Sequence, residues 1–320
     1  MKRFTDRITP WVILSMMLVW SGMSLGQEID CPSAVTVNGA SLEVASDKAG
    51  DDTENIQCAL DAAVNGGYRD VYLTSSSYTI ASINATAYIG DLRGTSKANT
   101  TVTIQDSSLS CETNLGVAMQ FNTGTVSVRN MTIEVDSPCG DSNSAAVIGF
   151  YSNPTRCNSR TTFGVVDRVA ITRTGTNSTD IVSGVVMQPA PGCTSSSERI
   201  LGTLKINRSD MSQLEFGVIT SVAGGGQVDI NYNTFTEMGL PVTILDASQG
   251  TTILGNDINY NDTDAYLSNT GLGTTGVFVA STSNSPNTNG TIIKNNTFYD
   301  GGESSSGFGI LLGQENKRVN

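Results

Sequence analysis

The sequence contains no histidine, and this absence excludes several kinds of active site. A serine–histidine triad, a histidine general base and a histidine-ligated metal are all impossible. Tryptophan is confined to Trp11 and Trp20, near the N-terminus. Charged residues make up only 15% of the chain. The chemistry that remains is that of carboxylates, of Lys and Arg, or of a bound calcium ion.

Basic residues are also scarce, since 18 Lys and Arg stand against 30 Asp and Glu, and the formal net charge is −12. An acidic surface repels nucleic acid, whose binding depends on Lys and Arg at the phosphates. The charge therefore predicts no nucleic-acid partner. It suits an exported protein or one that binds calcium.

The first 26 residues have the pattern of a secretory signal peptide. Lys2, Arg3 and Arg7 precede an apolar run over residues 11–23, and such a run of ~13 residues is shorter than the ~20 needed to span a bilayer. We predict cleavage near Gly26, no stable membrane insertion afterwards, and a secreted protein, extracellular or periplasmic. A membrane anchor is the alternative interpretation.

One short pattern recurs along the chain and predicts its fold. In Val228–Phe235, apolar residues occupy positions 1, 3 and 8, and Asn233 occupies position 6. The copies begin at Val71, Val102, Val126, Gly164, Leu204, Val228, Thr251 and Thr291. Positions 1 and 3 alternate with polar residues, as in a half-buried strand. We expect position 6 to adopt the left-handed conformation at a bend and to hydrogen-bond the same position of neighbouring copies.

A second row of strands falls between these copies, and we call it the Gly-Val row. Its members begin at Gly116, Ala146, Gly184, Gly217, Pro241, Gly276 and Gly309. Two rows that recur in the same order predict an all-β solenoid of stacked coils with loops inserted between strands.

The residues that should face outward from the Gly-Val row carry no charge. They are Ala118, Ile148, Val186, Ile219, Thr243, Phe278 and Leu311, followed by Gln120, Phe150, Gln188, Ser221, Leu245, Ala280 and Gly313. Because this face is so apolar, we expect it to be covered by loops, by residues 27–49 or by a partner.

Six cysteines follow the N-terminal segment, and the even count suits disulfides in an exported chain. Stacked coils are ~4.8 Å apart, a separation that a disulfide can bridge. The coil register predicts Cys111–Cys139 and Cys157–Cys193, and the remaining pair is Cys31–Cys58. A metal site made of these cysteines is disfavoured because the sequence has no Cys-x-x-Cys.

A short amphipathic helix is predicted at about residues 51–65. Asp51 and Glu54 suggest a capping box, and Gly66-Gly67 ends the helix. Its apolar face consists of Ile56, Leu60, Ala63 and Val64. Because the bare end of a solenoid invites aggregation, we expect this helix to cover the first coil.

The segment around this helix resembles a known superfamily. Gly50-Asp51-Asp52-Thr53, Ala59-Leu60-Asp61-Ala62-Ala63 and Asp70-Val71-Tyr72-Leu73 are similar to the opening segment of the pectin-lyase-like superfamily, and the Asn-x-apolar repeats resemble its coils. The resemblance covers about residues 50–314. It implies a right-handed parallel β-helix with an N-terminal cap helix, and a polysaccharide bound on the sheet of the Gly-Val row. The superfamily also contains non-catalytic proteins, so no single activity is implied.

With this resemblance the chain divides into a signal peptide (1–26), an N-terminal extension (27–49) and a parallel β-helix domain (50–320), whose coils occupy about residues 70–314. After Leu312 a new coil begins without being completed. We expect a missing segment or a partner chain to cover that end.

The sequence departs from the catalytic patterns of the superfamily. The histidine of polygalacturonase-like relatives is missing, and so are their Asn-Thr-Asp, mid-helix Asp-Asp and Arg-Ile-Lys motifs. Mixed outward charges on the repeat strands are interpreted as a solvated face; they are Arg129, Asp167, Lys205, Asp229 and Lys294.

The best remaining candidates are carboxylates in loops beside the Gly-Val row. Asp246, Asp262 and Asp264 are the predicted catalytic residues, and Asp262 with Asp264 is the predicted calcium site. The predicted sugar contacts are Tyr266, Phe278, Asp300 and Glu303. These segments belong to consecutive coils, so they can converge. Solvated loop acids are the alternative interpretation.

Two functions follow from the sequence. The first is that of a secreted protein that interacts with a polysaccharide or another glycan, either as a lyase or glycoside hydrolase acting through loop carboxylates or calcium, or as a relative of such an enzyme. The second is that of a non-catalytic surface, matrix or adhesin-like protein.

Overall fold

The computed structural model describes residues 29–47, 50–111, 115–139, 144–152, 162–175, 181–190, 202–221, 226–245, 250–260, 275–280, 290–300 and 308–312, and only the backbone of residue 300. The chain divides into two compact units, Met1–Asp30 and Cys31–Asn320, and all the elements described belong to the second. Within the ranges given, no helix has the length and apolar character needed to cross a membrane.

The described residues form one helix and two sheets of strands. The helix is α2 (Thr53–Gly66). The strands before residue 140 are β1 (Val35–Asn38), β2 (Ser41–Val44), β3 (Asp70–Leu73), β4 (Ser77–Ile80), β5 (Ile83–Thr86), β6 (Ile89–Arg93), β7 (Thr101–Ile104), β8 (Gly116–Asn122) and β9 (Gly124–Val135). The later strands are β10 (Ser144–Tyr151), β11 (Thr162–Arg173), β12 (Ile181–Gln188), β13 (Gly202–Asn207), β14 (Asp210–Ser212), β15 (Phe216–Ser221), β16 (Gln227–Asn231), β17 (Thr234–Met238), β18 (Leu240–Leu245), β19 (Thr251–Leu254), β20 (Asp257–Tyr260), β21 (Thr275–Ala280), β22 (Thr291–Lys294), β23 (Thr297–Asp300) and β24 (Phe308–Leu312).

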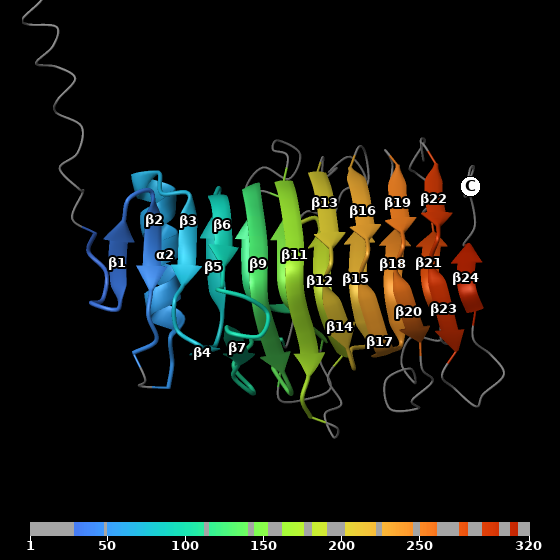
Figure 1. Ribbon diagram of the computed structural model, residues 1–320, viewed down its shortest axis with the longest axis horizontal. Coiled ribbons are helices and arrows are strands. Elements are labelled where there is room, and N and C mark those ends of the chain that lie inside the picture. Colours follow the sequence, from blue (N-terminus) through green and yellow to red (C-terminus); the bar gives the residue numbers. More distant parts are fainter. Residues whose placement is uncertain are drawn as a thin grey trace, which may run out of the picture. The chain divides into compact units, whose positions relative to one another are not determined.

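Neighbouring strands in each sheet come from successive repeats of the sequence, as Figure 1 shows along the row from β1 to β22. The long sheet has the order β1-β2-β3-β6-β9-β11-β13-β16-β19-β22, with side branches β4-β7-β9 and β11-β14-β17-β20-β23. The second sheet contains the strands of the Gly-Val row, and we call it the Gly-Val sheet. Its order is β5-β8-β10-β12-β15-β18-β21-β24. Apart from the antiparallel pair β1 and β2, the described pairs are parallel. The predicted all-β architecture with parallel strands is confirmed.

The predicted register of the repeat is confirmed from Val126 onward. The position-1 residues pair in turn as Val126, Gly164, Leu204, Val228, Thr251 and Thr291. The position-8 residues pair in turn as Ile133, Ile171, Met211, Phe235, Ile258 and Phe298. Equivalent positions of successive repeats therefore lie side by side in one row.

The starts of the first two copies of the repeat, Val71 and Val102, were assigned to the wrong positions, whereas Tyr78 lies in the row of position 8 as assigned. Val71 pairs with Leu92, which pairs with Val128, so Val71 belongs to the row of position 3. Val102 pairs with Tyr78 and Ile133, so it belongs to the row of position 8. The strand that the pattern missed is β6, which turns only one apolar residue, Leu92, into the core.

Buried asparagines connect successive repeats, as predicted for position 6. The Oδ1 of Asn233 accepts a hydrogen bond from the Ser209 amide at 2.9 Å. The Oδ1 of Asn256 accepts from the Asn233 amide at 2.8 Å, and the Oδ1 of Asn296 accepts from the Asn256 amide at 2.9 Å. Each Nδ2 also donates to a backbone carbonyl of the preceding repeat, such as that of Ile230.

The left-handed conformation expected at position 6 falls one residue earlier. The corner residues with positive φ are Asn130, Arg168, Arg208, Tyr232, Gly255 and Asn295. The physical reason is that position 6 must turn its side chain into the asparagine stack, so the preceding residue makes the sharp bend.

Helix α2 covers the first repeat, as predicted. It buries Ile56, Ala59 and Leu60 and contacts β2, β3 and β5. Gly67 ends it in the left-handed conformation, at φ 73°, where glycine fits best. The expected capping box does not form, because the N-cap residue is Asp52 and its carboxylate accepts hydrogen bonds from the backbone of Asp47 and Thr79.

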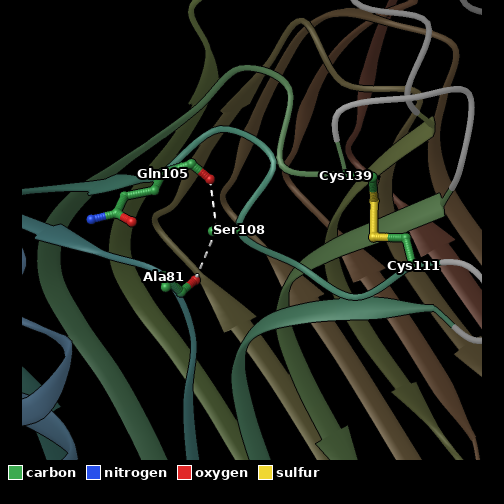
Figure 2. Close-up of a disulfide and its surroundings, with 5 residues drawn as sticks. All are labelled: Ala81, Gln105, Ser108, Cys111 and Cys139. Atoms are coloured by element: carbon green, nitrogen blue, oxygen red, sulfur yellow. Dashed lines mark hydrogen bonds between the residues drawn. A yellow bond between two sulfur atoms is a disulfide. The ribbon is translucent and has the colours of Figure 1, made fainter.

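Two of the three predicted disulfides are confirmed, Cys31–Cys58 and Cys111–Cys139. The Cα atoms of the second pair are 5.7 Å apart, and this bond joins the loops after β7 and β9 (Figure 2). In the same loop Ser108 donates a hydrogen bond to the Gln105 carbonyl at 2.6 Å and lies 3.5 Å from that of Ala81 (Figure 2). Cys157 and Cys193 lie outside the described residues.

The asparagine stack predicts a graded loss of stability on mutation. Asn256 is fully buried, so Asn256→Ala leaves the Asn233 amide and the Ile230 carbonyl without partners. An unpaired buried polar group costs about 1–3 kcal/mol, and we expect a total loss of about 3 kcal/mol or more. Asn296→Ala, at a partly exposed position, should cost only ~1 kcal/mol because water reaches the freed groups. Urea unfolding followed by circular dichroism measures both, and equal losses would contradict the stack.

Candidate functional site

Most of the predicted site residues cannot be placed. Asp246, Asp262, Asp264, Tyr266 and Glu303 lie outside the described residues.

Two of the predicted contacts have a described backbone. Asp300 ends β23 and pairs with Tyr260, although its side chain is not described. Phe278 lies on β21, partly buried, between its register partners Thr243 and Leu311. Since Phe278 faces outward from the Gly-Val sheet, that sheet is where a site can be built from described residues.

The outward face of the Gly-Val sheet differs from the prediction in its early strands. Ile148 pairs with the inward Val185, and the ring of Phe150 stacks on that of Phe121 at 5.7 Å, so both side chains lie in the core. The outward residues of β10 are instead Gly149 and Tyr151. From β12 onward the predicted outward row Val186, Ile219, Thr243, Phe278 and Leu311 pairs in register.

A cluster of neutral amides occupies the first strands of this face. Asn122 donates a hydrogen bond to the Oδ1 of Asn84 at 2.9 Å, and Gln120 donates to the Oδ1 of Asn122 at 3.0 Å. Gln57 of helix α2 holds the backbone of Asn84 through bonds of 2.7 and 2.8 Å. These side chains come from β5 and β8, and Asn84 is exposed while Gln120 is partly so. The cluster is an ordered set of donors and acceptors at the surface.

The middle of the face is buried. Tyr151 is 1% exposed and packs with Ala190 and Val117. Burial raises the pKa of Tyr151 to about 12, and the nearby Gln188 opposes that rise. Among the described residues no group reaches hydrogen-bond geometry with the Tyr151 hydroxyl. Residues 35–44 belong to one of the three covers that we considered, but they form β1 and β2, which extend the long sheet instead.

The later strands make the face apolar. Ile219, Leu245 and Phe278 are each partly exposed there, and no described outward residue of the Gly-Val sheet is charged. A carboxylate pair or a lysine base is therefore absent from the described part of this face. Catalysis on this sheet would depend on the loops that carry the predicted acids.

A cleft of about 530 Å³ lies beside the start of helix α2 and is lined by Ser46, Gly50, Asp52, Ser75, Ser76, Ser77 and Thr79. The carboxylate of Asp52 is only 2% exposed. Its oxygens accept hydrogen bonds from Ser46, Asp47 and Thr79 at 3.0–3.2 Å. These bonds hold the chain before α2 against β4, so the aspartate has a structural role.

Several of the outward charges on the long sheet form ion pairs with one another. Arg208 binds the Oδ1 of Asp167 through both Nε and Nη2, at 2.9 and 2.6 Å. Lys205 lies 3.7 Å from Asp229. In the described part of the chain no group of three Asp, Glu, Cys or His side chains is placed to hold a metal ion, and the predicted calcium ligands lie outside it.

Glu215 is a buried acid that the sequence analysis did not single out. It lies between β14 and β15 and is 1% exposed. Burial raises the pKa of Glu215 to about 7, although the buried Arg173 opposes the rise. Its apolar flanks, Leu214 and Phe216, give no sign in the sequence that an acid is buried between them. Glu215 is the one described carboxyl group whose pKa is raised into the neutral range.

Comparisons with protein-family models, with curated proteins and with solved structures give no match for this chain.

The raised pKa of Glu215 predicts a pH-dependent stability. Because the folded state favours the protonated acid, stability is complete below pH 4.5, the ordinary pKa of a glutamate, and falls as pH rises toward about 7. Glu215→Gln imitates the protonated form, so the variant should match the wild type at pH 4. At pH 8 it should be more stable than the wild type by on the order of 3 kcal/mol.

Urea unfolding at a series of pH values measures this difference. The exposed Glu237→Gln on β17 serves as the control and should show no such trend. A difference between Glu215→Gln and the wild type that stays constant with pH would contradict the assignment.

Proposed function

We propose that the chain is an exported parallel β-helix protein that binds polysaccharide on the outward face of its Gly-Val sheet. The observation that carries the proposal is the amide cluster of Asn84, Gln120 and Asn122 on that face. Neutral amides donate and accept hydrogen bonds, as the hydroxyl groups of a sugar require.

The strand order supports a helical winding of the chain. Each repeat contributes strands to both sheets, and each strand pairs in parallel with its equivalent in the next repeat. Parallel strands in one sheet are joined by right-handed crossovers in nearly all proteins. We therefore infer a right-handed helix, in agreement with the resemblance to the pectin-lyase-like superfamily.

The disulfides support export. Cys31–Cys58 and Cys111–Cys139 are at bonding distance, and such bonds persist in oxidising compartments such as the periplasm or the extracellular space. The N-terminal pattern of basic residues before a short apolar run agrees with this location.

The amides on this face are ordered before a ligand binds, and this supports binding there. Asn122 is 3% exposed, and its bond to Asn84 fixes the amides before any ligand arrives. A polar surface that is already ordered loses little side-chain entropy on binding. The partly exposed apolar residues farther along, such as Phe278, offer surface for the carbon-bound faces of sugar rings.

The absence of charge on the described face favours binding over catalysis there. An enzymatic form of the proposal, as a lyase or glycoside hydrolase, depends on Asp246, Asp262 and Asp264, with calcium held by the last two. A non-catalytic surface or matrix protein is the second candidate function. The same uncharged face favours it.

A pair of substitutions on the face tests polysaccharide binding. Gln120→Ala with Gln188→Ala removes two partly exposed amides, and each lost hydrogen bond is worth about 0.5–1.5 kcal/mol. We expect binding to neutral and acidic polysaccharides to weaken by about tenfold or more in affinity electrophoresis. Gln227→Ala, exposed on the long sheet, is the matched control. Equal retardation of both variants and the wild type would contradict the proposal.

The same polysaccharides decide between binding and catalysis. Unsaturated products absorbing near 235 nm would establish a lyase, and new reducing ends without that absorbance would establish a hydrolase. If Asp262→Ala with Asp264→Ala abolishes turnover, the loop acids are the site. Binding without either product, with and without EDTA, would establish the non-catalytic function.

A further inference from the structure

One corner of each repeat bends through the same backbone conformation. At Asn130, Arg168, Arg208, Tyr232, Gly255 and Asn295, which we call the corner row, φ lies between 51° and 65°. This left-handed region suits glycine and asparagine but disfavours residues with larger side chains. The backbone is therefore strained at three of these corners, two of which are arginine and one tyrosine.

The corner row is continuous from repeat to repeat. The amide of Arg208 donates to the Asn231 carbonyl at 3.2 Å, that of Tyr232 to the Leu254 carbonyl at 2.9 Å, and that of Gly255 to the Lys294 carbonyl at 3.1 Å. Neighbouring strands of a sheet are ~4.8 Å apart. Because the corners share one conformation, their side chains leave the backbone in the same direction and form a row.

The side chain of Tyr232 does not pack in the core, so core packing does not offset the strain of its backbone. Tyr232 is 62% exposed. Arg208 by contrast has a structural partner, Asp167, which accounts for its presence. Strain that is kept at an exposed position points to a function.

The ring of Tyr232 rests on the next repeat. A Cβ atom at Gly255 would lie 2.8 Å from both Cδ1 and Cε1 of the ring, so only glycine leaves space for it. The glycine also has a positive φ of 65°, which suits the corner. The ring is thus supported from one side and open to solvent on the rest of its surface.

Positive charge flanks this ring. Arg208 precedes it in the row, and its side chain is 53% exposed. Lys294 and Asn295 lie in the repeat beyond Gly255 and are both exposed. Within the described residues, Arg168 and Lys294 make no ion pair. Because Asp167 pairs with Arg208, Lys294 is the flanking cation whose charge remains available to a ligand.

We propose that the corner row is a second binding site, which takes an acidic polysaccharide by stacking a sugar ring on Tyr232 with its carboxylate toward Lys294. The proposal rests on the proposed binding of polysaccharide but uses a different surface. An aromatic ring offers a flat apolar face to the C–H side of a sugar. A carboxylate on that sugar is attracted by the Lys294 ammonium group.

Two variants separate binding from folding. Tyr232→Asn removes the ring and suits the left-handed corner, so its melting temperature should equal or exceed that of the wild type. Its affinity for polygalacturonate or alginate, both polymers of uronic acid, should fall about tenfold. Tyr232→Phe keeps the ring and should bind like the wild type. A Tyr232→Asn variant that binds as tightly as the wild type would overturn the proposal.

The preference for carboxylates is tested with a neutral form of the polymer and with a variant of Lys294. Methyl-esterified polygalacturonate keeps the rings but loses the carboxylates, so it should bind more weakly, and Lys294→Gln should lose affinity only for the unesterified polymer. Equal binding of the two polymers would overturn the preference for acidic sugars.

The two binding surfaces can fail separately. If Tyr232→Asn loses affinity while Gln120→Ala with Gln188→Ala does not, the corner row stands and the face of the Gly-Val sheet fails. The opposite result would overturn the corner row and leave the other proposal in place.

Discussion

Hydrogen bonds between successive repeats are the interaction on which the rest of this structure depends. Backbone bonds join equivalent strands in parallel, and buried asparagines add a second line of bonds at the corner. Side chains alternate between the two faces of a strand, so a slip of one residue would exchange core and surface. The buried amide of Asn256 resists such a slip, because it would lose partners that water cannot replace there.

A fixed register turns single residues into rows, and the rows define the surfaces. The amides of Asn84 and Gln120 are ordered because β5 and β8 pair in register. Tyr232 meets Gly255 for the same reason, since their strands are neighbours. Elsewhere the register pairs opposite charges, as in Lys205 with Asp229, and those surfaces are neutralised. The two proposed sites are rows that expose other groups, the amides of Asn84 and Gln120 in one and the ring of Tyr232 in the other.

The sequence predicted the register from Val126 onward, where five residues separate the row of position 3 from the row of position 8, as in Val128 and Ile133. It failed before Val126, because seven residues separate Val71 from Tyr78 and ten separate Leu92 from Val102 in the same two rows. In β6 only Leu92 faces the core, so the strand was missed and Val102 was assigned to the wrong row. In β10 the run from Ala145 to Tyr151 is buried on both faces, so alternation could not show which side of Ile148 is inward. The corner row could have been predicted from the sequence, since its members directly precede position 6. The contact of Tyr232 with Gly255 could be predicted only after the register of their strands was known.

Nitroxide labels on the exposed Ser77 and Thr297, attached through residues other than cysteine, test the register most directly. These residues belong to one row, paired in turn through Thr101, Thr132, Ala170, Asp210, Thr234 and Asp257. Seven strand spacings of ~4.8 Å place their backbones ~34 Å apart. Double electron–electron resonance should give a single narrow distribution near that distance, widened by the label arms. A broad distribution, or one centred far from that value, would contradict the stacking of the repeats in register.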